Sequence, residues 1–443
     1  MTELKFIKDG WIEGYVDDAD ERATYTRLKI VAGNAVLTRA FSKRGGGETE
    51  ALNLPIFSLT SYIARLWWPL LYEPLRAHES LRVKEGEAFL GRHRLDLPMH
   101  GDVFPSLGLC SAGDDAVLIE WALLENEYSP LRFLTLPPKE PLQLSRESVE
   151  LELMDLVESA LARLNSGSSA HAKLDGDWNR VKESLGNPAQ ASYCMAAGRL
   201  GIDPYDPEAP DIGRFAENLP EDLFKDISEA IDVSNLANTT EWTLQAKQAL
   251  DSFPTIDVEA FGEPPRDDLR ITAGEVGFHA AKALRARLGL GDNPRKAVVT
   301  LLGGTAAKSS VLAENGPAPV TGLTHRTNGL AHIGTLARSA RQRHFRASAA
   351  AYIAWCSQPG DIRAGTVAFT RRQQASRAFA AELVAPRSYL FERGGKAGFT
   401  EEDIEEVAGD LVAPHDTVYW QALRGGVPLL DVEPRQPRQS SFF

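Results

Sequence analysis

Alternating apolar and polar residues are the main pattern of the first 135 residues, and they predict β-strands. Residues 24–30 (TYTRLKI) and 35–41 (AVLTRAF) both alternate, and Gly33-Asn34 lies between them. Two alternating segments joined by a short turn of Gly and Asn predict a β-hairpin. Another strand is predicted at 116–121, where the sequence reads AVLIEW.

A single helical segment is predicted inside this strand-rich part. Its start is expected at Ser58, and its apolar residues keep a helical spacing as far as Leu70. Pro69 should end or kink the helix, because proline lacks the N–H that an interior turn needs. A proline-rich segment at 137–141 marks a boundary. We therefore predict a β-rich α+β domain at 1–140.

The apolar spacing becomes helical from Ser145 onward. Val149, Leu153 and Leu156 share one face of such a helix, and similar patterns continue to Phe253. These patterns predict a helical domain at 145–262, whose role the sequence leaves open.

The remaining segment is also mainly helical. Helices are predicted at 273–290, 336–356 and 371–383. Gly289 should close the first of them, since glycine readily adopts the left-handed conformation that ends helices. We predict a domain at 267–430 and a flexible tail at 431–443. The chain is thus expected to be an α+β multidomain protein with a strand-rich N-terminal domain, a helical middle and a mainly helical C-terminal domain.

The composition is that of a globular protein. A chain of 443 residues, 43% of them hydrophobic and 25% charged, is expected to form two or three domains. The three cysteines are far apart and form no C-x-x-C, which argues against a disulfide framework and a structural zinc knuckle. The first residues lack a signal-peptide pattern, and no apolar run approaches the roughly 20 residues that span a bilayer. We expect a cytoplasmic protein with no membrane partner.

Charge is distributed unevenly along the chain. The formal net charge is −13, yet residues 326–396 contain twelve basic and only three acidic residues. Overall acidity makes a general affinity for nucleic acid or anionic membranes improbable. The basic stretch could attract a polyanion, or it could pair with acidic residues of this same chain, which is the commoner outcome.

One segment closely matches a known family motif. Residues 376–386 read SRAFAAELVAP, close to Ala-Asn-x-Phe-Ala-Ala-Glu-Leu-Leu-x-Pro, although Ser376 and Arg377 replace the usual Ala-Asn pair. On this motif, residues 273–427 resemble the ImmA/IrrE family of metallopeptidases. Supporting matches lie at 278–290, 341–346 and 404–427. The resemblance implies a zincin-like fold for the C-terminal domain.

The zinc motif of that family is missing. An active member carries H-E-x-x-H on one helix, where two imidazoles four residues apart bind one Zn²⁺ and the glutamate activates a water. The three corresponding positions hold Ala349, Ala350 and Ile353. The place of a further ligand falls on Gln373 or Ala375. Since none of these side chains holds zinc well, we expect no metal, no cofactor and no peptidase activity.

The resemblance implies a binding or regulatory protein, a metallopeptidase-like pseudoenzyme. Family members often occur beside phage repressors, toxin–antitoxin pairs or stress regulators, so a phage-defence, toxin–antitoxin or stress-response setting with a protein partner is expected. The former cleft would supply the binding surface. Its expected lining residues, which could equally be ordinary helix surface, are Arg346, Tyr352, Gln373 and Arg377.

Two other functions stay open. An enzyme of another class could have its site in the N-terminal domain, around Arg92, His93 and His100, where basic and imidazole groups cluster. A nucleic-acid binder could use the basic stretch at 326–396, and its affinity should then fall steeply with salt.

Overall fold

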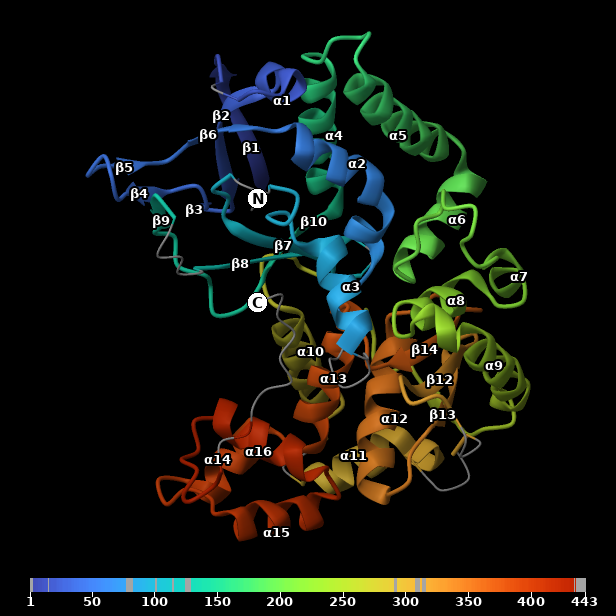
Figure 1. Cartoon of the computed structure of the whole chain (residues 1–443). Coiled ribbons are helices and arrows are strands. Elements are labelled where there is room, and N and C mark those ends of the chain that lie inside the picture. Colours follow the sequence, from blue (N-terminus) through green and yellow to red (C-terminus); the bar gives the residue numbers. More distant parts are fainter. Residues whose placement is uncertain are drawn as a thin grey trace. The chain divides into compact units, whose positions relative to one another are not determined.

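The computed structural model describes residues 3–14, 16–76, 83–99, 102–113, 115–123, 129–290, 293–306, 311–312, 316–433 and 435. The chain divides into two compact units (Figure 1). Unit 1 extends to Pro210, and unit 2 extends from Asp211 to Arg435, the last described residue. Helices make up 47% and strands 18% of the protein, which confirms the predicted α+β class. The boundary between the units lies inside the segment 145–262, whose helices belong partly to each unit.

Unit 1 combines three small antiparallel sheets with helices. Its strands are β1 (Leu4–Trp11), β2 (Tyr25–Ala32), β3 (Ala35–Val36), β4 (Ala40–Ser42), β5 (Glu48–Thr49), β6 (Leu52–Pro55), β7 (Ser106–Ser111), β8 (Ala116–Ala122), β9 (Leu131–Phe133) and β10 (Leu142–Ser145). Its helices are α1 (Ala19–Ala23), α2 (Phe57–Tyr72), α3 (Val83–His93), α4 (Arg146–Leu161), α5 (Ser169–Gly186) and α6 (Pro188–Arg199). One sheet has the order β1-β2-β3 with β6 also on β2, and the others are β10-β8-β7 and β5-β4-β9.

The predicted hairpin at Gly33-Asn34 is confirmed, but its second strand is short. β2 pairs with β3 through Val31 and Val36, and Gly33 has a φ of +60°. The pairing stops because the side chain of Thr38 replaces a backbone partner: its Oγ1 accepts from Ile30 N and donates to the Glu50 carbonyl. The chain then continues into a different sheet as β4.

Helix α2 has the kink predicted at its proline. Leu66 has non-helical angles (φ −103°, ψ 16°), and Pro69 lies three residues further on, inside the helix. The predicted start was slightly wrong: Ile56 is the N-cap residue, so Ser58 belongs to the first turn and does not cap it. Ile56 supplies no side-chain hydrogen bond to that turn.

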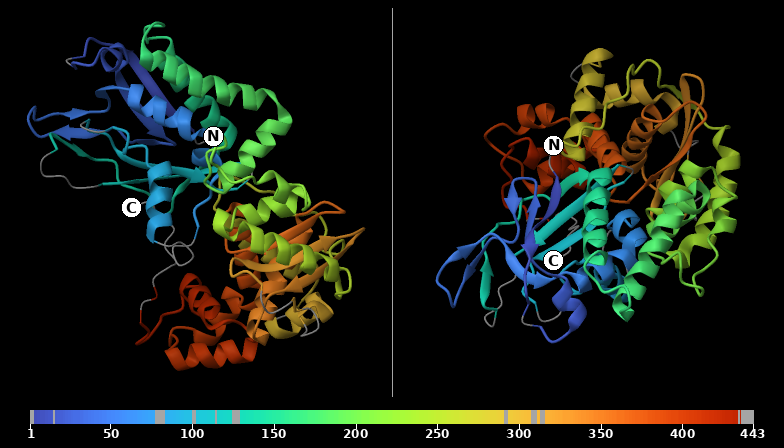
Figure 2. Two further views of the ribbon diagram at one scale, coloured as in Figure 1. Left: turned by 45° about the vertical axis from the view of Figure 1, so that its right-hand side comes forward. Right: turned by 90° about the horizontal axis from the view of Figure 1, so that it is seen from above.

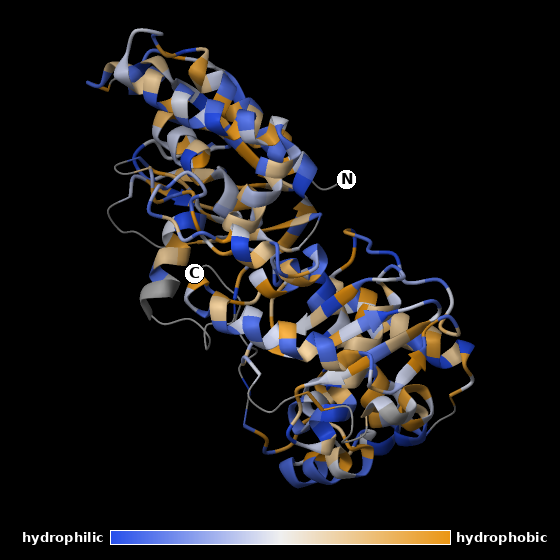
Figure 3. Cartoon of the chain, turned by 90° about the vertical axis from the view of Figure 1, so that its right-hand side faces the viewer, coloured by the Kyte–Doolittle hydropathy of each residue, from blue (hydrophilic) through white to orange (hydrophobic). Residues whose placement is uncertain are grey.

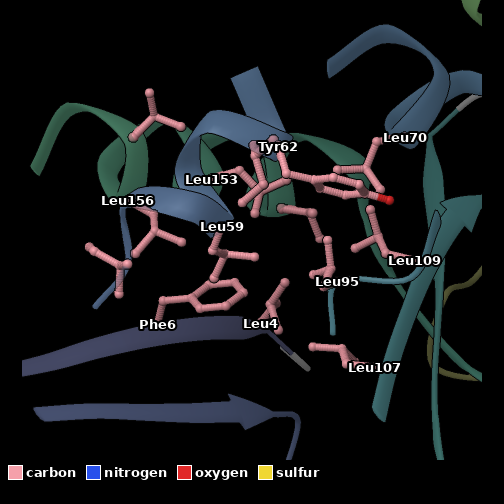
Figure 4. Packing of buried hydrophobic residues seen from close by; sticks show 14 of the residues in the cluster. Leu4, Phe6, Leu59, Tyr62, Leu70, Leu95, Leu107, Leu109, Leu153 and Leu156 are labelled. Carbon is pink, nitrogen blue, oxygen red and sulfur yellow. The ribbon is translucent and has the colours of Figure 1, made fainter. Parts of the chain in front are cut away.

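The core of unit 1 forms where the first sheet, α2, α4 and β7 meet. Figure 4 shows Phe6 of β1, Leu59 of α2, Leu153 of α4 and Leu109 of β7 converging on one apolar region. Deeper along α2, Trp67 packs edge-on against Trp178 of α5. Both indoles are almost fully buried, so they anchor the core.

Unit 2 is mostly helical and contains one antiparallel sheet. Its helices are α7 (Gly213–Ala216), α8 (Glu221–Ser228), α9 (Leu236–Leu250), α10 (Ala273–Arg287), α11 (Pro294–Leu302), α12 (Ala340–Trp355), α13 (Arg371–Val384), α14 (Arg387–Gly394), α15 (Glu401–Leu411) and α16 (His415–Arg424), with short 3-10 turns at Val233–Asn235 and Gly303–Ala306. The strands β11 (Thr255–Asp257), β12 (Val320–Arg326), β13 (Leu330–Thr335) and β14 (Ile362–Thr366) have the order β11-β13-β12-β14. Helix α12 covers one face of this sheet, and α8 and α9 lie on the other (Figure 2).

The three helices predicted for this part are confirmed, and their ends have clear causes. Thr272 and Glu275 form a capping box that starts α10. Gly289, with a φ of +56°, closes it. The Ser339 side chain accepts from Gln342 N and starts α12. Figure 3 shows apolar and polar residues mixed along most helices, as in helices that bury one face.

None of the helices in the described residues is long and apolar enough to cross a membrane. Most of the tail predicted at 431–443 lies outside the described residues. Arg435 is described, and its guanidinium pairs with Asp416 and Glu401.

Candidate binding site

The three positions of the missing zinc motif lie together on α12, inside unit 2. Ala349 is 8% exposed, Ala350 2% and Ile353 0%. All residues from Ala347 to Trp355 are buried, because α12 has the sheet on one side and α11 and α13 on the other. This helical turn therefore contributes small apolar surfaces to the core and no metal ligand.

Gln373, the candidate for a further ligand position, hydrogen bonds to a strand. It lies on α13, and its Nε2 donates to the Ala364 carbonyl at 2.8 Å. Its Oε1 accepts from Thr366 N at 2.9 Å. Both bonds are to β14, an edge strand of the sheet, so the side chain takes the place of a neighbouring strand. Both ends of the Gln373 amide are therefore occupied by hydrogen bonds within the fold.

Two of the predicted binding residues are likewise held by the fold. Tyr352 is 4% exposed and packs against the rings of Phe379 and Trp355. Burial raises the pKa of Tyr352 well above its ordinary value. Arg377 donates to the carbonyl oxygens of Thr366 and Ala368, at 3.0 and 2.9 Å. Tyr352 and Gln373 thus lie inside the unit, away from its surface.

Arg346 has a different environment, because other basic side chains lie near it. Burial lowers the pKa of Arg346, and the neighbouring Arg338 lowers it further. Burial also lowers the pKa of His344, and so do Arg295 and Arg343. We name these five residues the α12 cationic cluster: Arg295 of α11, Arg338 just before α12, and Arg343, His344 and Arg346 in its first half.

The α12 cationic cluster has unused hydrogen-bonding capacity. His344 Nδ1 and Arg343 Nε are buried and have no hydrogen-bond partner among the described residues. Within the same described part of the chain, Arg338, Arg343 and Arg346 form no ion pair. Because like charges in proximity repel, an anion beside the accessible parts of these arginines would relieve the repulsion.

Most other arginines of the basic stretch at 326–396 are bound within unit 2. Arg363 pairs with Asp226 and Asp222, Arg371 with Asp267, and Arg341 with Glu405. Others bind backbone or side-chain oxygens: Arg326, Arg377, Arg387 and Arg393. Four arginines of this stretch are thus ion-paired inside the unit, and three more are bound by neutral oxygens, whereas Arg338, Arg343 and Arg346 of the α12 cationic cluster have no acidic partner among the described residues.

Glu382 belongs to the family-like motif at 376–386, and it has a structural role. Glu382 is 3% exposed, and its Oε2 accepts from Arg387 N, the first residue of α14, at 3.2 Å. The same oxygen accepts from Gln421 Nε2 of α16 at 2.9 Å. Burial raises the pKa of Glu382, although these bonds and Arg387 oppose the rise. Glu382 thus joins the ends of α13, α14 and α16.

The alternative site in unit 1 is a buried ion cluster. Arg92 donates two hydrogen bonds of 2.7 Å to the fully buried carboxylate of Glu73. His93 Nε2 lies 3.1 Å from the same carboxylate, and its Nδ1 lies 2.7 Å from the Leu109 carbonyl. Gly201 closes the cluster, since a Cβ there would lie 2.6 Å from Glu73 Oε1.

The sequence had grouped Arg92 and His93 with a third residue, His100, which lies outside the described residues. It had missed Glu73, to which both side chains point. Burial opposes ionisation of Glu73, but the hydrogen bonds from His93 and Arg92 outweigh it and lower its pKa to about 2. Burial lowers the pKa of His93, although the Glu73 carboxylate opposes this fall. Arg92 and His93 both bind the Glu73 carboxylate inside the unit, as in a structural ion cluster.

A resident zinc ion does not fit the residues that the structure provides. No group of three or more His, Cys, Asp or Glu side chains that could hold a metal occurs among the described residues. Comparison with protein-family models, with curated proteins and with solved structures finds no match for this chain.

Proposed function

We propose that this protein is a catalytically silent, ImmA/IrrE-like module that acts by binding a protein partner. The regulatory setting would be phage defence, toxin–antitoxin control or a stress response. One observation carries the proposal: the helical turn from Ala349 to Ile353, where a zinc motif would lie, is apolar and buried. Metal-assisted hydrolysis needs ligands that hold the ion and a base that activates water, and this turn offers neither.

The packing around α12 supports a zincin-like interpretation of unit 2. Helix α12 lies against an antiparallel sheet, with α13 beside it and α10 packed on α13. In this interpretation α12 takes the place of the zinc helix. Gln373 on α13, bound to β14, takes the place of a more distant ligand.

The partner surface that best fits the α12 cationic cluster is acidic. Arg343 and Arg346 are half-buried, so carboxylates that reach them would bind in a partly desolvated place where charge-assisted hydrogen bonds are strong. Complementary charge of this kind mainly speeds association and selects the partner. Binding should therefore weaken as salt concentration rises.

The first test addresses catalysis. We expect the purified full chain to contain far less than one zinc per molecule by elemental analysis, and to leave peptide substrates uncut with or without added Zn²⁺. Near-stoichiometric zinc, or cleavage that a chelator abolishes, would overturn the proposal.

The second test addresses binding. Proteins captured from the native host by the wild-type chain are compared with those captured by Arg343→Gln/Arg346→Gln. The matched control is Arg424→Gln, an exposed arginine of α16 outside the cluster. We expect an acidic protein that is captured by wild type and control but lost with the double variant. If the captured proteins are the same for all three chains, the cluster is not the binding surface. If the wild-type chain captures nucleic acid and no acidic protein, the alternative function of nucleic-acid binding is favoured.

A further inference from the structure

Unit 1 contains a pocket that is separate from the ion cluster around Glu73. Its volume is about 440 Å³, within the range of small-molecule sites. One wall is a single face of α2, with Ser58, Ser61 and Arg65 at helical spacing. Lys173 and Asp177, four residues apart on α5, form a second wall.

The α2 wall of this pocket has a buried hydroxyl without a partner among the described residues. This hydroxyl is Ser61 Oγ. The first turn of α2 has no side-chain cap, although Phe57 N donates to Thr24 Oγ1. A buried hydroxyl without a partner is costly, and a ligand that bonds to it removes that cost.

The charged groups of the pocket favour an anion. Arg65 and Lys173 are exposed, and within the described part of the chain neither forms an ion pair. Asp177, the one carboxylate among the described lining residues, is paired with Arg180 on its own helix. Its negative charge is thus balanced by Arg180, and the two remaining cations determine the sign of the potential.

The rest of the lining is apolar. Phe57, Leu97 and Pro98 contribute side chains without hydrogen-bonding groups, and Tyr62 contributes its ring. The Tyr62 hydroxyl is occupied, because it donates to the Gly91 carbonyl at 3.0 Å. A pocket with apolar walls and a few convergent polar groups is typical of sites for small organic ligands.

We propose that this pocket binds a small organic anion, in which one phosphate or carboxylate group is joined to a flat apolar body. The anionic group lies beside Ser61, Arg65 and Lys173, and the apolar body lies against Phe57 and Leu97. This site is in unit 1 and is independent of the partner binding proposed for unit 2.

Calorimetric titration of the full chain tests this site with phenyl phosphate and benzoate as probes. Inorganic phosphate tests the anionic group alone, and benzylamine tests an aromatic cation of similar size. We expect saturable binding of phenyl phosphate or benzoate, weaker binding of inorganic phosphate, and none of benzylamine. The tighter of the two aromatic anions identifies the preferred anionic group.

Variants then locate the site. Arg65→Gln and Lys173→Gln should each weaken binding about tenfold, and Ser61→Ala severalfold. Arg27→Gln, an exposed arginine of β2 outside the lining, is the matched control and should bind like wild type. Thermal unfolding of each variant verifies the fold.

Three results would overturn the proposal. These are failure of both aromatic anions to saturate the wild-type chain at millimolar concentration, equal binding of benzylamine, and unchanged affinity in a folded Arg65→Gln/Lys173→Gln variant. These three results test the pocket in unit 1 alone. They do not depend on whether the α12 cationic cluster of unit 2 captures a protein partner.

Discussion

Arg363 and Asp226 form a two-point ion pair in the interior of unit 2. The guanidinium Nε and Nη2 donate to the two carboxylate oxygens at 2.8 and 2.7 Å, and the side chains are 4% and 3% exposed. The Ala364 N–H also donates to Asp226. The pair attaches β14 to α8, and so fixes the strand to which Gln373 also binds.

Removal of one partner of this pair should be costly. With Asp226→Asn we expect the free energy of unfolding to fall by up to about 3 to 5 kcal/mol, because the guanidinium of Arg363 loses its buried countercharge and keeps only Asp222, whose side chain is 44% exposed. Hydrogen exchange of β14 and α8 amides, together with urea unfolding, measures the change. Arg393→Gln, which removes an exposed pair with Glu406 and Asp410, should cost under about 1 kcal/mol. Similar losses in the two variants would contradict the structural role of the Asp226 pair.

The contact between α10 and α13 depends on a glycine. A Cβ at Gly277 would lie 2.0 Å from the Ala375 carbonyl oxygen and 2.8 Å from Phe379 N, both backbone atoms. Gly277→Ala should therefore separate the helices and lower the free energy of unfolding by about 1 to 3 kcal/mol or more. Gly274→Ala on the same helix meets only Thr272 Oγ1 at 3.8 Å and should be neutral or slightly stabilising. Thermal unfolding of both variants decides, and a Gly277→Ala variant as stable as wild type would disprove this close approach.

The helices and the first hairpin could be predicted because their signals are local. Gly289 was predicted to close a helix and does so. Thr272 and Ser339 were not predicted as helix starts, although each has the side-chain hydroxyl that caps a first turn in the structure. The strands β12 and β13 were missed, although Asn328-Gly329 lies between them and Gly329 has a φ of +79°.

The candidate sites depend on contacts between distant segments, and a single sequence carries little trace of those contacts. Glu73 lies 19 and 20 residues before Arg92 and His93, beyond the reach of any local pattern. The pocket unites α2 with α5, which lie more than a hundred residues apart. The zinc motif, by contrast, is local: a single turn of α12 would supply three of its side chains. Their absence could therefore be predicted from the sequence alone.

The stability of unit 1 should depend on pH through Glu73. Burial disfavours its charge, but His93 and Arg92 reverse the effect and lower the pKa to about 2. An unfolded glutamate titrates near 4.5, so between about pH 4.5 and 2 the unfolded chain binds the extra proton. Stability is then full above the unfolded pKa and is lost as pH falls, by about 3 kcal/mol in total.

The test of this pH dependence compares wild type with Glu73→Gln. The free energy of unfolding, measured in urea between pH 7 and 3, should fall more steeply for wild type than for the variant. Tryptophan fluorescence is a suitable probe, because Trp67 and Trp178 are buried in unit 1. Glu158→Gln alters an exposed carboxylate of α4 and should retain the wild-type slope. Parallel curves for wild type and Glu73→Gln would show that this carboxylate does not carry the acid sensitivity.

Introduction of imidazole at the former zinc-motif positions should damage the fold and bind no metal. Ala349→His places a ring where α12 faces the sheet and its neighbouring helices, and Ile353→His adds a polar group to a fully buried place. We expect the pair to lower the free energy of unfolding by more than about 3 kcal/mol, through overpacking and unsatisfied hydrogen bonds. Gln342→His, on the exposed first turn of α12, should change stability by under about 0.5 kcal/mol. If the double variant instead folds normally and retains zinc through gel filtration, α12 borders an open cleft, and the closed packing described above is wrong.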